Sequence, residues 1–68
     1  MKSASGKDLA RVLEQNGWRL LRIQGSHHIY GKAGEEARIS IPIHAGSTLK
    51  TGLLRHLLKI AGLNEHDL

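Results

Sequence analysis

Five histidines in 68 residues are a high count for a chain that has no cysteine. Two of them, His27 and His28, are adjacent and follow the turn-forming pair Gly25-Ser26. Histidine changes its charge near neutral pH, with a reference pKa of about 6.5, so it can take up or release a proton during a reaction. The first question is therefore whether these side chains bind a metal ion or transfer protons.

The spacing of the histidines argues against a metal site. Adjacent residues of a strand point to opposite faces, so His27 and His28 cannot easily chelate one ion. His56 and His66 are too far apart in the sequence to form an i, i+4 pair, and no set of carboxylates accompanies them. Without cysteine, disulfide bonds and thiolate metal sites are excluded. We expect no metal and no cofactor.

Proton transfer suits the attack of an RNA 2′-hydroxyl on the neighbouring phosphate. This reaction needs a base for the hydroxyl, an acid for the leaving oxygen, and cations for the charge on the phosphate. His27 or His28 could be the base or the acid. Gly25 permits the close approach of a phosphate, and Ser26 adds hydrogen-bond donors. Alternatively, Gly25-Ser26 is an ordinary hairpin turn followed by a polar residue. The candidate cations are Arg22, Arg38, Lys50 and Arg55.

The charge balance favours a polyanionic partner. Lys and Arg number 10 against 6 acidic residues, a formal net charge of +4, and basic residues gain free energy by displacing counterions from phosphates. With one Trp, one Tyr and no Phe, a platform of aromatic side chains for stacking bases is not expected. Glu35 and Glu36 would repel RNA, so their loop should lie outside the binding surface. Lys50, near the start of a helix, could assist phosphate binding or belong to a flexible connector.

The hydrophobic pattern predicts the element order α-β-β-β-α. Ser5 and Asp8 have the spacing of a capping box at the start of a first helix, and Gly17 suits its end. Gly25-Ser26 predicts a tight turn between two strands, and Pro42 predicts an edge or a strand end. The predicted ranges are a helix at 6–16, strands at 18–24, 27–32 and 38–43, and a second helix from Lys50 or Thr51 to Gly62.

Alternation along the strands predicts which side chains face the core. Ile39, Ile41 and Ile43 should lie on one buried face. In the first strand, Leu21 and Ile23 should share one face, and Trp18 and Leu20 the other. In the second strand, regular pairing would place His27 with Ile29 toward the helices and His28 with Tyr30 on the open face.

Consecutive hairpins give a three-stranded antiparallel sheet, and both helices need its apolar face. We therefore expect an α+β fold with both helices on one face of the sheet, the shape of a double-stranded-RNA-binding domain. Residues 1–68 should form one domain. No stretch is apolar enough to span a membrane or to act as a signal peptide, so we expect a soluble cytoplasmic protein.

An ordered set of short motifs resembles the HicA (YcfA-like) toxins over nearly the whole chain. The matching segments are Gly17-Trp18, Gly25-Ser26-His27-His28, Ile41-Pro42-Ile43-His44, Leu49-Lys50-Thr51-Gly52 and Ala61-Gly62-Leu63. Each motif is weakly specific by itself, whereas their order and spacing together are more specific.

This resemblance implies a metal-independent endoribonuclease that cleaves mRNA and is neutralised by a HicB-type antitoxin. It also implies that the histidine of the Gly-Ser-His motif, His27, is catalytic. Because strand alternation would place His28 on the open face, His28 is kept as the second candidate. Gly25, Ser26, Lys50, Arg22 and Arg38 would bind RNA phosphates. The alternatives are a non-catalytic RNA-binding module of the same fold and an inactive domain that only binds other proteins.

Overall fold

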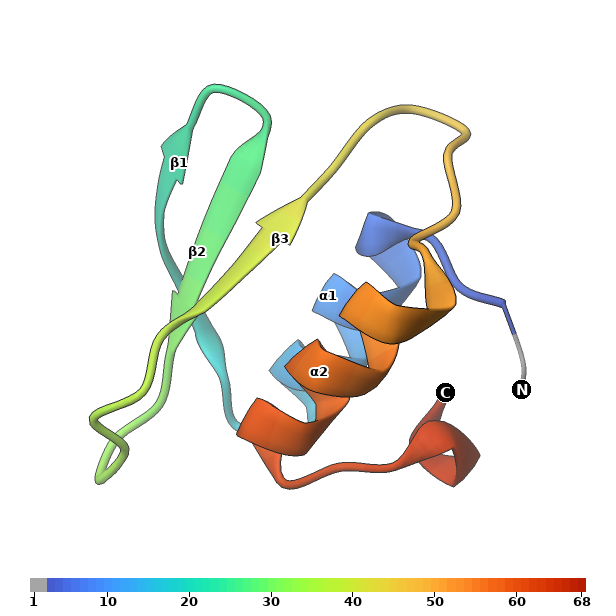
Figure 1. Ribbon diagram of the computed structural model, residues 1–68. Helices are drawn as coiled ribbons and strands as arrows, with labels where there is room; N and C mark the ends of the chain where they lie inside the picture. The colour runs from blue at the N-terminus through green and yellow to red at the C-terminus, as the bar shows by residue number, and fades with distance from the viewer. Residues whose placement is uncertain (1–2) are drawn as a thin grey trace.

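The computed structural model describes residues 3–68 and confirms the predicted order of elements (Figure 1). Each strand is one or two residues shorter than its predicted range. The elements are α1 (Gly6–Gln15), β1 (Arg19–Gln24), β2 (His27–Gly31), β3 (Ile39–Pro42), α2 (Thr51–Ala61) and a short 3-10 helix, η1 (Glu65–Asp67).

The start of α1 and the C-terminal ends of both α-helices lie where the sequence signals indicate. The Ser5 hydroxyl accepts a hydrogen bond from the Asp8 backbone N–H at 3.1 Å, and the Asp8 carboxylate accepts one from the Ser5 N–H at 3.0 Å. The backbone hydrogen bond from Ser5 is the largest cause that lowers the pKa of Asp8. Gly17, just after α1, and Gly62, the C-cap of α2, have positive φ angles of 91° and 72°, a conformation in which glycine avoids the strain of a side chain.

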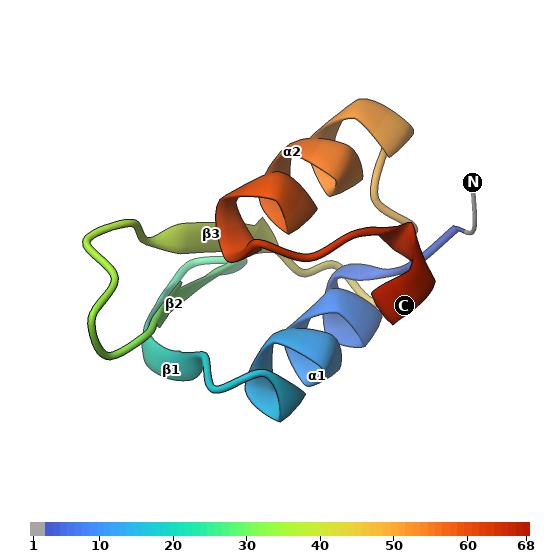
Figure 2. The same cartoon turned by 90° about the horizontal axis from the view of Figure 1, so that it is seen from below.

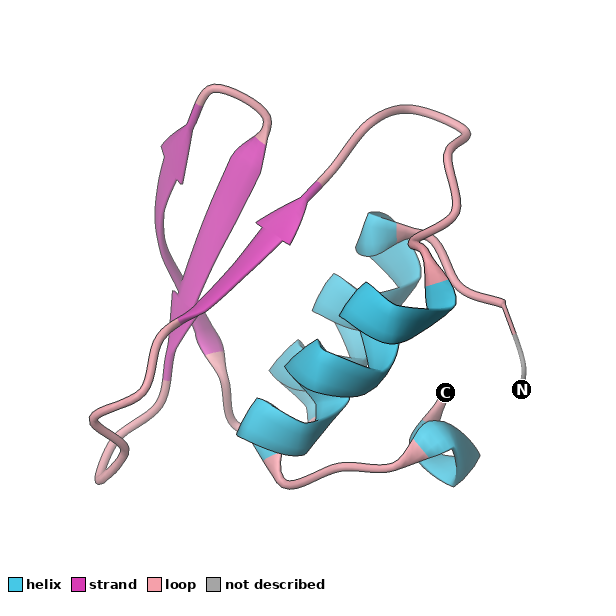
Figure 3. Ribbon diagram, in the orientation of Figure 1, coloured by secondary structure: helices cyan, strands magenta, loops and turns pink. Residues whose placement is uncertain are grey.

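The three strands form an antiparallel sheet in the order β1-β2-β3, and both helices pack on one of its faces. Figure 2 shows the two helices side by side, with α1 nearer β1 and α2 nearer β3. The fold is therefore the predicted α+β arrangement, and it is consistent with a double-stranded-RNA-binding-domain shape. Figure 3 shows the loops that connect these elements. The five most deeply buried large side chains are Leu9, Leu13, Ile39, Ile41 and Leu54.

Strand register corrects two predictions about side-chain direction. A bulge between Leu20 and Arg22 interrupts the alternation of β1. Because residues paired across strands share a face, Leu20 opposite Tyr30 and Ile23 opposite His28 both lie on the helix-facing side. The prediction that Leu21 and Ile23 share a face was therefore wrong.

The prediction that His27 faces the helices and His28 the open side of the sheet was also wrong. Tyr30 and His28 pair with Ile39 and Ile41, the buried residues of β3, so they face the helices. His27 consequently lies on the open face of the sheet, together with Ile29.

Gly6 marks a close approach between the start of α1 and the end of β3. A Cβ atom at this position would lie 2.6 Å from the carbonyl oxygen of Pro42 and 2.9 Å from Cγ1 of Ile43. Any side chain at Gly6 would therefore force α1 and β3 apart.

Among residues 3–68, neither helix combines the length and the hydropathy that crossing a lipid bilayer requires.

Candidate active site

His27 is the first residue of β2, and its exposed side chain lies on the open face of the sheet. Its Nδ1 atom is 3.1 Å from the hydroxyl oxygen of Ser40 in β3. The backbone beside it is held by a 2.7 Å hydrogen bond from the Ile43 N–H to the Ser26 carbonyl, which ties the turn to β3. In the tautomer that donates from Nδ1 to Ser40, the Nε2 atom has a lone pair that can accept a proton.

Polar residues of β1 lie next to His27 on the same face. Gln24 is directly opposite His27, and Arg22 is opposite Ile29, one step along the diagonal. Diagonal neighbours in a sheet are separated by about 7–8 Å, a span that a long side chain can cover. His27, Ser40, Gln24 and Arg22 thus form a group from three strands that we call the open-face cluster.

The charged residues that the strands place on the open face are all basic. None of the three strands contains an acidic residue, whereas β1 contains Arg19 and Arg22. Within residues 3–68 neither arginine takes part in an ion pair. A phosphate placed beside His27 would therefore meet cations and hydrogen-bond donors without a competing carboxylate from the strands.

Two of the predicted phosphate-binding residues lie apart from His27. Arg38 reaches over Gly31, at the far end of β2, and four residues of strand span about 13 Å. Its guanidinium also donates to three carbonyls of its own loop, those of residues 35, 36 and 37. Lys50 is the N-cap of α2, a helix that packs on the other face of the sheet. Of the predicted phosphate-binding residues, Gly25 and Ser26 directly precede His27 in the turn, and Arg22 lies on the adjacent strand.

The acidic pair Glu35 and Glu36 lies in the loop between β2 and β3, at the opposite end of the hairpin from Gly25-Ser26 (Figure 1). Its negative charge is thus remote from the open-face cluster.

His28 has different surroundings. It is half-buried on the helix-facing side, where it lines a shallow groove of about 620 Å³ between α1 and the sheet. The same groove is lined by Lys7 and Arg11 from α1 and by Leu20 from β1. The two adjacent histidines therefore face two separate surfaces, which makes each a control for the other.

Tyr30 also lines this groove, and its hydroxyl donates to a carboxylate oxygen of Glu14 at 2.9 Å. Three effects raise the pKa of Tyr30 to about 12: burial of the phenol, which is the largest, then its hydrogen bond to Glu14, and then the negative charge of Glu14. The neutral phenol is thus favoured in the folded state.

The titration of Tyr30 gives a direct test of this packing. It is the only tyrosine, so absorbance near 295 nm should report a pKa of about 12 in the folded protein and one of about 10 after unfolding in urea. Because the pKa of Tyr30 is higher in the folded state, protonation of the phenol stabilises the fold. This contribution to the free energy of unfolding is complete below pH 10 and is lost as the pH rises toward 12. Glu14→Gln should lower the folded value only in part. A folded pKa near 10 would contradict the burial of the phenol.

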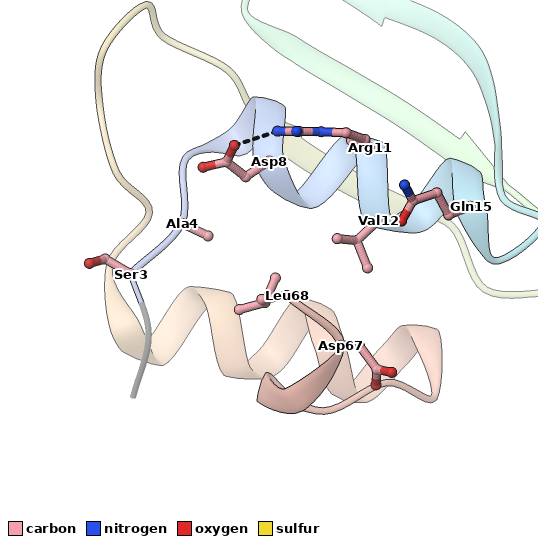
Figure 4. Close-up of a pocket in the computed structure, with 8 residues that line it drawn as sticks. All are labelled: Ser3, Ala4, Asp8, Arg11, Val12, Gln15, Asp67 and Leu68. Atoms are coloured by element: carbon pink, nitrogen blue, oxygen red, sulfur yellow. Dashed lines mark hydrogen bonds and ion pairs between the residues drawn. The ribbon is translucent and has the colours of Figure 1, made fainter.

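A second hollow, of about 410 Å³, lies between α1 and the C-terminal segment (Figure 4). Its ion pair, Arg11 to Asp8 at 2.7 Å, joins two residues of the same helix and is exposed. None of the residues predicted to carry chemistry lines this hollow. In the described part of the chain, no three histidine or carboxylate side chains come together as a set of metal ligands.

Sequence reasoning missed two members of the open-face cluster, Ser40 and Gln24. The alternation of Ile39, Ser40 and Ile41 does place Ser40 on the open face, and this was the available signal. Its contact with His27 depends on the register between β2 and β3, which no local motif specifies.

Comparison with known proteins identifies the family of the chain. No match to this chain was found among curated proteins. A family model described as the HicA toxin of bacterial toxin-antitoxin systems matches residues 6–63, which include every strand and both α-helices. This chain belongs to the HicA toxin family.

Proposed function

We propose that the protein is a metal-independent endoribonuclease that cleaves mRNA on the open face of its sheet. The observation that carries this proposal is the exposed His27, held by Ser40 on a basic face without strand carboxylates. An open basic face accepts an extended single strand, which suits a substrate as large as mRNA. We place the reaction in the cytoplasm, where mRNA is found.

In this mechanism Nε2 of His27 removes the proton from a ribose 2′-hydroxyl. The 2′ oxygen attacks the adjacent phosphorus, the bond from phosphorus to the 5′ oxygen breaks, and the leaving oxygen takes a proton from solvent. Ser40 holds the ring through Nδ1, at 3.1 Å, and this contact leaves Nε2 available for the substrate. Arg22 stabilises the negative charge that develops on the phosphate oxygens, and the Gly25-Ser26 turn leaves room for the backbone of the RNA.

The partner in this proposal is a HicB-type antitoxin. Membership in a toxin family of toxin-antitoxin systems implies a neutralising partner, and the net charge of +4 favours an acidic surface on it. An antitoxin that covers His27 and Arg22 would exclude RNA from the open face.

The products and the metal dependence of the reaction test this function. Purified protein should cleave a labelled single-stranded RNA in excess EDTA at the same rate as without it, because each proposed group is a side chain of this protein. The 5′ fragments should end in 2′,3′-cyclic phosphate, since the 2′ oxygen is the nucleophile. Mass spectrometry of the fragments distinguishes this end from a linear phosphate.

Two results would contradict the mechanism. Loss of cleavage in EDTA, with recovery on adding a divalent cation, would mean that a metal ion performs the chemistry. Binding of RNA without cleavage under any condition would instead favour a non-catalytic RNA-binding module.

A further inference from the structure

Strand β1 forms an edge of the sheet, and its outer side has no partner strand in the described chain. All six of its residues are exposed. Three of them are large and apolar, with exposed fractions of 43% for Leu20, 50% for Leu21 and 55% for Ile23. An exposed apolar edge strand has unpaired backbone N–H and C=O groups that can pair with another strand. Strand β1 is therefore a candidate binding surface.

The bulge in β1 distributes these apolar side chains over both faces of the edge. Leu20 and Ile23 lie on the helix-facing side, opposite Tyr30 and His28. Gly31 follows the inward-facing Tyr30 and therefore faces the open side. A Cβ atom on Gly31 would lie 2.7 Å from Cδ1 of Leu21, so Leu21 is on the open side as well. A strand added beside β1 would therefore find apolar contacts on both of its own faces.

The charges around β1 indicate what kind of strand would fit. Arg19 and Arg22 belong to β1 itself, and Lys7 lines the neighbouring groove. Across residues 3–68 none of these three cations is held in an ion pair. A second copy of this chain would add its own Arg19 and Arg22, and no acidic residue of β1, to the same edge, and this gathering of like charges is unfavourable. Acidic side chains would complement them.

We propose that β1 is the docking edge for an extended segment of a partner protein in which apolar and acidic residues alternate. This segment adds to the sheet as a fourth strand beside β1. Main-chain hydrogen bonds hold it along the edge, and its side chains contact Leu20, Leu21 and Ile23. We identify the partner as the antitoxin, a step that rests on the proposed function. Because Arg22 belongs to both the edge and the open-face cluster, docking there neutralises a cation beside His27.

One pair of matched variants tests the role of the edge. Ile23→Lys replaces an apolar side chain of β1 with a charged one, and Leu53→Lys makes the same change at an exposed position of α2. Both add one positive charge, so attraction by net charge alone would affect them equally. The probe is the purified HicB-type antitoxin of the same toxin-antitoxin system, titrated by calorimetry against toxin freed from it. Ile23→Lys should weaken binding by about 10- to 100-fold, while Leu53→Lys should bind like the wild type.

Hydrogen exchange on the wild-type complex provides a second test that needs no variant. Amides of Arg19–Gln24 should exchange more slowly in the complex than in the free toxin, because new main-chain hydrogen bonds protect an edge strand. The proposal fails if Ile23→Lys binds the antitoxin like the wild type while still folded, or if protection appears on β3 or α2 and not on β1.

Measuring RNA binding separately keeps this proposal distinct from the nuclease. If Ile23→Lys loses affinity for single-stranded RNA and keeps its affinity for the antitoxin, β1 belongs to an RNA-binding surface and the proposal is overturned. Neither binding measurement requires cleavage. A toxin that binds its antitoxin through β1 but leaves RNA intact would support the docking edge and refute the nuclease.

Discussion

Replacement of His27 by alanine is expected to lower the rate of RNA cleavage by about 100- to 10,000-fold, the contribution typical of a general base. The exposed imidazole hydrogen-bonds to Ser40 and is not part of the buried core, so the variant should fold normally. Cleavage of a labelled RNA by purified wild type and variant measures the effect. Growth of cells after induction, with equal soluble amounts of each protein, provides the corresponding test in vivo.

His28→Ala is the matched control, because it removes the same kind of side chain one residue away on the opposite face of β2. It should retain most of the cleavage activity. If His28→Ala abolishes cleavage and His27→Ala does not, the reaction belongs to the groove that Lys7 and Arg11 line. If both variants are as active as the wild type, neither histidine transfers a proton in the rate-limiting step.

Truncation of Leu13 to alanine is expected to leave much of the protein unfolded at 25 °C. Leu13 is fully buried in α1, and removal of a buried leucine costs about 2–5 kcal/mol. The core of a domain this small rarely supplies more than about 3–5 kcal/mol of net stability. Urea denaturation, followed by the fluorescence of the single tryptophan, Trp18, should therefore show a much lower midpoint or no folded baseline.

Leu53→Ala is the control for this experiment, since Leu53 is 37% exposed on α2. It should change the free energy of unfolding by less than about 1 kcal/mol. Equal losses for the two leucines would mean that Leu13 is not part of the core as described.

The ends of the helices could be predicted because their signals are local. The capping box of Ser5 and Asp8 and the positive φ at Gly17 and Gly62 depend on residues within one turn. The order of the strands followed from the tight turn at Gly25-Ser26. These features need no knowledge of the packing partner.

The faces of the strands could not be predicted because they depend on tertiary contacts. β2 carries an apolar residue on each side, Ile29 on the open face and Tyr30 toward the helices, and both are buried. Periodicity alone therefore does not tell which side is the core. In β1 the bulge at Leu20 and Arg22 shifts the alternation, and no residue type marks its position.

The same distinction holds for the candidate site. The Gly-Ser-His turn and the basic composition directed attention to His27 and Arg22, which the sheet brings near each other. Ser40 lies thirteen residues from His27 in the sequence and belongs to no motif. Only the pairing of β2 with β3 makes it a neighbour. Arg38 and Lys50 have suitable chemistry, but the fold places them elsewhere.

The tight contact at Gly6 connects the position of α1 to the position of β3, which forms part of the open face. Pro42, whose carbonyl oxygen would be 2.6 Å from a Cβ at Gly6, pairs across strands with His27. A side chain at Gly6 would displace the end of β3, and with it the frame that fixes Ser40 against the histidine. In a genetic screen for loss of activity, Gly6 would therefore behave as an active-site position, although it lies on the opposite side of the sheet from the proposed chemistry.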